Sequence, residues 1–252
     1  EIPLREFLLA REWNPTSMGK PMYGILSMLV STFMVSFGAL ALAVPLGIGA
    51  AAFLSDIASK KVREIVKPLV EILAGIPSVV LGFLGLTLFG PFLARVFHLP
   101  NGLNAVNGSI LLAVMALPTI ISLSEDALNS VPKTYSEASL ALGATRWQAL
   151  ITVRIPAAAS GIIAPCMLGM GRAIGETMTV LMATGNAPAM PHGFFDAVRT
   201  MTAAIAIELG EVAYNSTHYY ALFAVGLVLF FITFVINLAA DILLHRVEGA
   251  SS

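Results

Sequence analysis

Long apolar runs alternate with shorter polar segments along the whole chain. A membrane-spanning helix needs about 20 predominantly apolar residues, and five stretches meet or approach that length: 22–54, 65–97, 109–123, 155–183 and 219–244. The third is short and is expected to borrow residues on either side. Because the runs are solid and do not alternate with polar positions, they predict helices and exclude a β-barrel. Pro45, Pro77 and Pro91 are expected to kink or end helices.

The composition agrees with a membrane protein. Apolar residues make up 57% of the 252 residues and charged residues 12%, and the mean hydropathy is +0.85, values far from those of a soluble domain. A net charge of -1 gives no basic surface for nucleic acid. The lone Cys166 excludes an internal disulfide, and the four histidines have no metal-ligand spacing. No metal site is predicted.

Lysine and arginine in short loops indicate the cytoplasmic side of a membrane protein. The loops expected on one side carry Lys60, Lys61, Arg63, Lys67, Lys133, Arg146, Arg154 and Arg246. The loops on the opposite side carry only Arg95 and Arg199. We therefore expect an extracytoplasmic segment 1–21, a transmembrane domain 22–252 with a cytoplasmic C-terminus, a cytoplasmic loop 124–156 and an extracytoplasmic loop 184–218. Arg5, Arg11 and Lys20 count against this orientation, which also requires one more spanning helix before Glu1.

The polar segment between the third and fourth stretches carries helix signals. Pro132 suits the first turn of a helix that runs through Glu137, and Gly143 suits the left-handed position after a helix end. Thr145 and Gln148 fit a capping box for a second helix. The segment therefore predicts a helical hairpin, which could be no more than an ordinary surface element.

The same hairpin resembles the EAA loop of ABC-importer permeases. Glu137-Ala138-Ser139, then Gly143, then Val153-Arg154-Ile155-Pro156 follow that pattern, with Ser139, Val153 and Ile155 as conservative departures. The resemblance implies a coupling helix seated on a cytoplasmic ATPase, with coupling residues Glu137, Ala138, Ser139, Gly143 and Pro156. The chain has no GxxxxGK[ST] phosphate-binding loop. It is therefore expected to be non-catalytic and to bind no cofactor, with ATP and Mg²⁺ held by a separate ATPase.

Two charges interrupt the fourth apolar stretch. If residues 157–183 form one helix, Arg172 and Glu176 share a face near the bilayer centre, where each charge costs at least about 2.5–3.5 kcal/mol and needs a partner. They form either a structural lock or part of an anion path, because a guanidinium stays ionised and matches an oxyanion. Gly171 and Gly175 form a GxxxG suited to close helix packing, against a second permease subunit or within the chain. The Thr177 hydroxyl could donate to a substrate or bond the preceding turn.

The string GRAIGETM, followed by TGN, resembles the phosphate-specific ABC permeases, of the PstC type. The resemblance extends to EILAGIPSVVLGFLGL (71–86) and FLLAREWNP (7–15). It implies a polytopic helical bundle of the type I ABC-importer permease kind in a bacterial or archaeal plasma membrane, with about five spanning helices here and one more before them. The implied partners are an extracytoplasmic phosphate-binding protein, a second permease, expected to be a distinct PstA-like relative, and an ATPase dimer.

Three alternatives remain open at this point. The first is an ABC permease for another oxyanion, such as sulfate or molybdate, which the EAA pattern does not distinguish from phosphate. The second is a secondary anion transporter that uses Arg172 and Glu176 as a relay, but the sequence has no inverted repeat with interrupted helices, and this reading leaves the EAA pattern unexplained. The third is a structural membrane scaffold, in which the buried charges would have no purpose.

Overall fold

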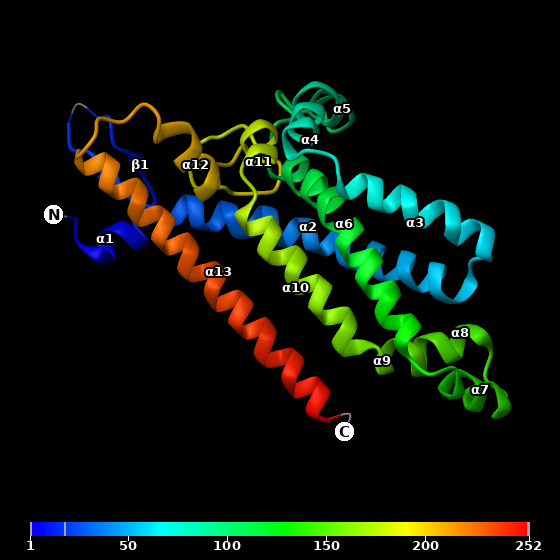
Figure 1. Cartoon of the computed structure of the whole chain (residues 1–252). Coiled ribbons are helices and arrows are strands. Elements are labelled where there is room, and N and C mark those ends of the chain that lie inside the picture. Colours follow the sequence, from blue (N-terminus) through cyan, green and yellow to red (C-terminus); the bar gives the residue numbers. More distant parts are fainter. Residues whose placement is uncertain (1, 18, 251–252) are drawn as a thin grey trace. The chain divides into compact units, whose positions relative to one another are not determined.

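The computed structural model describes residues 2–17 and 19–250, and only the backbone of residues 243–250. Its regular structure is almost entirely helical (Figure 1). The helices before the hairpin are α1 (Leu4–Leu9), α2 (Leu26–Ala52), α3 (Lys60–Ala74), α4 (Ser78–Leu84), α5 (Gly90–Val96) and α6 (Ala105–Ser130). The later ones are α7 (Lys133–Ala141), α8 (Arg146–Ala149), α9 (Ile155–Ala157), α10 (Ala159–Gly175), α11 (Met178–Ala183), α12 (Met201–Glu208) and α13 (Thr217–Ala250).

Short irregularities accompany these helices. Three π-helical turns continue a preceding helix: η1 (Phe53–Ile57), η2 (Gly85–Phe89) and η3 (Leu150–Arg154). Two strands of two residues each, β1 (Trp13–Asn14) and β2 (Met22–Tyr23), pair antiparallel, with Trp13 opposite Tyr23. The sequence pattern did not indicate this small hairpin, since Met22 lies inside the first apolar stretch.

The predicted helical membrane architecture is confirmed, with corrections to its bounds. Among the described residues, four helical segments are long and apolar enough to cross a membrane: Leu26–Ile57, Ser78–Val96, Ala105–Ser130 and Thr217–Ile242. A bent pair, Arg146–Ala157 with Ala159–Gly175, is a fifth candidate. The short third stretch does extend on both sides, as expected. Pro45 does not end its helix but lies inside α2, whereas Pro77 directly precedes α4 and Pro91 stands in the first turn of α5.

The second predicted stretch is wrong in its first half. The helix is interrupted between α3 and α4, at residues 75–77, and α3 is amphipathic and not apolar throughout. One face of α3 carries the exposed apolar side chains Val62, Ile65, Leu69, Ile72 and Leu73. Charged residues at helical spacing occupy the other face, so the spanning segment begins only at Ser78.

Close packing divides the chain into two units, each assembled from three segments. The first contains residues up to 39, 77–113 and 172–234; the second contains 40–76, 114–171 and the residues from 235 onward. The core of the first unit is formed by Phe7, Trp13, Ile25, Met28, Met201, Ala204, Ala221, Leu222 and Val225. Each large side chain buried there contributes roughly 1.5–3 kcal/mol. The N-terminal segment is therefore packed against α12 and α13.

The second unit combines a small apolar core with ion pairs. Its buried residues are Ala51, Ala52, Leu128, Val131, Leu150, Ala158 and Ile162. In the same unit, Arg63 and Lys67 of α3 pair with the fully buried Glu125 of α6, and Lys67 Nζ lies 2.8 Å from Glu125 Oε2 and 3.0 Å from Asp126 Oδ1. The hydrogen bond to Glu125, more than any other contact, raises the pKa of Lys67. These contacts fix the polar face of α3 on α6.

Candidate substrate path and coupling hairpin

The fourth predicted helix is interrupted at the position of its charges. We expected one helix over 157–183, but α10 ends at Gly175 and α11 begins at Met178 (Figure 1). Gly175 is a poor helix former, and the Glu176 carboxylate accepts from the first turn of α11: Thr179 N lies 3.2 Å and Thr179 Oγ1 3.3 Å from Glu176 Oε1. Glu176 therefore acts as a cap, and the expected continuous helix is wrong.

Neighbouring elements of the same unit satisfy the polar groups freed by this break. The Thr202 hydroxyl of α12 donates to the Glu176 carbonyl oxygen at 2.7 Å. The buried Thr179 hydroxyl also lies 3.1 Å from the carbonyl oxygen of Ser78, the first residue of α4. A broken helix is tolerated in a membrane only where its backbone groups find such partners. The break is thus held in place by α4 and α12.

Arg172 and Glu176 are not paired with each other in the structure. Arg172 lies one turn before the end of α10 with an exposed side chain, and Glu176 is half-buried beyond the helix end. Among the described residues, no side chain or carbonyl oxygen makes an ion pair or hydrogen bond with the Arg172 guanidinium. The arginine is therefore available to a ligand or to another subunit, and its role in transport stays a prediction.

The other residues predicted near this site, Thr177, Gly171 and Gly175, make few contacts. The Thr177 hydroxyl lies 3.4 Å from the Gly175 carbonyl oxygen, so it bonds the preceding turn. A Cβ placed on Gly171 would lie 3.2 Å from Asn237 Oδ1 of α13, whereas nothing lies within 4 Å at Gly175. The close approach at Gly171 is therefore within this chain, and the face at Gly175 is open.

The predicted hairpin between α6 and α10 is confirmed in its local detail. Gly143 has φ +89, the left-handed conformation expected after α7. The capping box of α8 is present: Gln148 N–H donates to Thr145 Oγ1 at 3.2 Å, and Thr145 N–H donates to Gln148 Oε1 at 2.8 Å. Pro132 is the N-cap of α7 and so lies one residue before the expected first turn.

The hairpin exposes the residues predicted for coupling together with large apolar side chains. Glu137 and Ala138 are exposed, Ser139 is half-buried, and no atom lies within 4 Å of the position of a Cβ on Gly143. Next to them, Leu142 is 90% and Trp147 is 61% exposed, which is costly for apolar side chains unless another molecule covers them. Pro156, also exposed, lies in α9, and the chain bends by 71° between α9 and α10.

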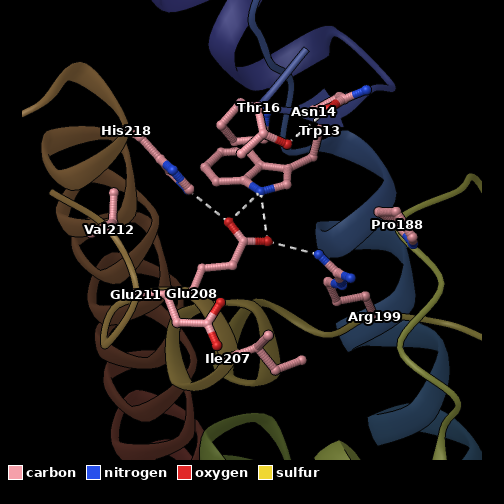
Figure 2. Close-up of a pocket in the computed structure, with 11 residues that line it drawn as sticks. Trp13, Asn14, Thr16, Pro188, Arg199, Ile207, Glu208, Glu211, Val212 and His218 are labelled. Carbon is pink, nitrogen blue, oxygen red and sulfur yellow. Dashed lines mark hydrogen bonds and ion pairs between the residues drawn. The ribbon is translucent and has the colours of Figure 1, made fainter. Parts of the chain in front are cut away.

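Sequence reasoning missed a polar cluster in the first unit, centred on Glu208 at the end of α12 (Figure 2). Its carboxylate accepts from Trp13 Nε1 at 2.9 and 3.0 Å, and lies 2.7 Å from Arg199 Nη1 and 2.7 Å from His218 Nε2. These residues border a pocket of about 510 Å³. Trp13 and Glu208 are 195 residues apart, so no local signal pairs them.

The predicted loop 184–218 is more ordered than expected. It contains α12, whose residues Met201, Thr202, Ala203 and Ala204 are buried. Before α12, the Asp196 carboxylate accepts from the backbone N–H groups of His192 at 2.7 Å and Gly193 at 3.0 Å. These two hydrogen bonds lower the pKa of Asp196. The apolar run of α12, MTAAIAIE (201–208), is too short to count as a span, so the sequence predicted only a loop here.

Comparisons with known proteins agree with the motifs. The family model for the binding-protein-dependent transport system inner membrane component matches residues 43–249. The chain is 41% identical over 241 residues to the probable ABC transporter permease protein YqgH of Bacillus subtilis, covering 96% of this chain and 78% of that one. It is 35% identical over 262 residues to the phosphate transport system permease protein PstC of Mesorhizobium japonicum, covering 96% and 79%.

A solved structure shares the fold. A chain of the MetNI methionine ABC transporter, in an inward-facing conformation, superposes with a TM-score of 0.65 over 89% of this chain and 94% of that one, at 23% identity. The type I importer permease fold expected from the EAA and GRAIGET motifs is thereby confirmed. The chain belongs to the family of binding-protein-dependent transport system inner membrane components, and within it is an ABC permease of the PstC type.

Proposed function

We propose that this permease carries inorganic phosphate from an extracytoplasmic binding protein into the cytoplasm, driven by ATP hydrolysis in a separate ATPase dimer. A second, PstA-like permease completes the pathway. In this proposal the hairpin and the C-terminus face the cytoplasm, as the distribution of lysine and arginine predicts.

The observation that carries the proposal is the exposed Arg172 guanidinium beside the break between α10 and α11, with no partner among the described residues. A positive charge in an apolar helix is costly unless it faces a water-filled path or a compensating anion, so an unpaired Arg172 favours a place on such a path. A guanidinium offers a planar fork of donors that matches phosphate. The identity to a protein named as a phosphate transport permease favours phosphate over other oxyanions.

Glu176 and the hairpin have separate roles in this proposal. The carboxylate of Glu176 caps α11 and so fixes the break next to Arg172, with Thr177 in the same gap. Glu137, Ala138, Ser139, Gly143 and Pro156 form the surface that meets the ATPase, and the exposed Leu142 and Trp147 add apolar area to it. When the ATPases close on ATP, the hairpin moves and the pathway opens to the extracytoplasmic side.

Uptake into proteoliposomes tests the substrate. The complex of both permeases and the ATPase is reconstituted with the binding protein outside and ATP inside, and entry of radiolabelled phosphate is measured. We expect binding-protein-dependent uptake that excess unlabelled phosphate abolishes and that excess sulfate or molybdate leaves intact. Uptake of sulfate or molybdate in place of phosphate would contradict the proposal. Uptake driven by an ion gradient without ATP would favour a secondary transporter.

A further inference from the structure

An ion pair connects the second arm of the hairpin to the end of α2. The Arg154 guanidinium, in η3, contacts the Asp56 carboxylate, in η1, through Nη1, and donates through Nη2 to the carbonyl oxygen of Leu128 in α6. The two charged side chains are only 12% and 20% exposed. A single side chain therefore joins three elements, and the three residues in contact all lie in the second unit.

The surroundings of this ion pair are closely packed. Leu128 and Leu150 belong to the buried apolar core beneath it, together with Ala51, Ala52, Val131, Ala158 and Ile162. A second link runs beside it, because the Ser55 hydroxyl donates to Asn129 Oδ1 at 3.1 Å and so also joins η1 to α6. Displacement of the hairpin arm would thus be transmitted to α2 and α6 without a flexible connection between them.

The ion pair between Arg154 and Asp56 is not the most stable way to join these elements. Asp56 Oδ2 and Arg154 Nε are buried without a hydrogen-bond partner, and buried polar atoms left in this state are destabilising. Both residues lie in π-helical turns, which are also less stable than α-helix and occur often at functional sites. A hydrophobic pair would hold these elements together at lower cost. The arrangement is better explained by a role in movement.

We propose that Arg154 and Asp56 are positioning residues of the transport cycle, which transmit the ATPase-driven displacement of the hairpin to α2 and α6. The inference rests on the proposed docking of the hairpin on the ATPase. It adds a defined mechanical connection, between η3 and η1, that the exposed coupling residues do not provide. The pair does not touch the substrate, so its loss should change the efficiency of coupling and leave the affinity of the binding protein for its solute unchanged.

The test compares Arg154→Gln and Asp56→Asn with the parental complex in proteoliposomes, measuring solute uptake and ATP hydrolysis together. Lys61→Gln is the matched control, since it removes an exposed positive charge from the same unit and has no ion pair among the described residues. We expect each test variant to assemble and to hydrolyse ATP, but to import about tenfold less solute per ATP, within the range for mutations along coupling networks. Lys61→Gln should keep the parental ratio.

Two further variants make the outcome decisive. The double change should be no worse than either single one, because the two residues act as a unit. Arg154→Lys keeps the charge but replaces the two-nitrogen fork of the guanidinium with a single ammonium, so its ratio should be intermediate, and it decides the matter if Arg154→Gln does not assemble. A parental ratio of uptake to ATP hydrolysis in the assembled variants, or failure of all of them to retain the ATPase, would overturn the proposal.

The test does not depend on the identity of the substrate. If the parental complex imports another oxyanion, the ratio is measured with that solute, so the substrate proposal can fail while this one stands.

Discussion

The coupling hairpin and the break between α10 and α11 both end a helix and start another, but they satisfy their freed backbone groups differently. In the hairpin, Gly143 N–H donates to the Leu140 carbonyl oxygen at 3.0 Å and Ala144 N–H to that of Ser139 at 3.2 Å, so the partners at its turn lie within a few residues. In the break, Glu176 depends on Thr202, 26 residues away.

This difference has a mechanical consequence. The turn of the hairpin can be displaced without losing its internal hydrogen bonds, while Arg154 in the second arm joins the hairpin to Asp56 and Leu128. The break cannot shift without disturbing Thr202 and the contact between Thr179 and Ser78, 101 residues apart. The hairpin is therefore suited to movement, and the break is suited to holding Arg172 in a fixed place.

The largest expected effect follows from changing Arg172. Arg172→Gln should lower phosphate uptake about hundredfold, because a hydrogen bond to a charged group contributes about 1.5–3 kcal/mol and 1.4 kcal/mol is a factor of ten. Thermal stability of the complex should remain near the parental value, since the side chain has no partner among the described residues. Lysine at this position should restore little uptake, because it lacks the fork of donors.

The double variant Arg172→Gln with Glu176→Gln separates the two readings of the charged segment. If the two charges only lock helices together, neutralising both should restore assembly and uptake. We expect no recovery, and parental uptake by an assembled double variant would contradict the anion path.

A smaller effect is expected at the turn of the hairpin. Gly143→Val should reduce uptake about tenfold, because a left-handed conformation costs a side chain roughly 1–2 kcal/mol and more if it is β-branched. The surroundings are open, so the strain is purely in the backbone. Gly143→Asn is the control, since asparagine tolerates this conformation. Equal activity of both variants would show that the turn can adopt another backbone conformation without loss of transport.

The stability of α11 should depend more on the hydrogen-bond acceptor that Glu176 provides than on the negative charge of Glu176. Glu176→Ala should destabilise α11 by about 1 kcal/mol, as the removal of other helix caps does. Glu176→Gln should be nearly neutral, because its amide oxygen can still accept from Thr179. Hydrogen exchange at the Thr179 amide measures both. Faster exchange in Glu176→Gln than in Glu176→Ala would be inconsistent with this capping role.

The smallest effect is expected at the capping box of α8. Thr145→Ala should destabilise the second arm of the hairpin by about 0.5–1 kcal/mol, and Thr145→Ser should retain the parental value. Exchange of the Gln148 amide, which donates to the Thr145 hydroxyl, reports the change. A change confined to the hairpin, with none at Thr179, would support its local organisation.

The hairpin was predictable from sequence because its determinants are neighbours. Gly143, Thr145 and Gln148 each act within four residues, so the pattern specified both the turn and the cap. The break between α10 and α11 was not predictable from sequence. The apolar run continues across it, and Thr202 and Ser78, which bond the residues at the break, are distant in sequence. Gly175 was interpreted as a packing glycine, although it also marks a helix end. The number and order of the spans followed from hydropathy, whereas the amphipathic α3 was included in a span because apolar residues on both sides concealed its charged face.

The Glu208 cluster also has a consequence for how the chain folds during its synthesis. Trp13 and Tyr23 emerge early in synthesis, whereas Glu208 and His218 emerge near its end. Gly24, beside β2, allows the backbone to approach Ala10 closely, since a Cβ there would lie 2.4 Å from the Ala10 carbonyl oxygen. The early segment can fold on itself, but the indole N–H of Trp13 has no acceptor until α12 is made. Contacts of such long separation form late, so this unit should acquire protease resistance only after α13 has been inserted.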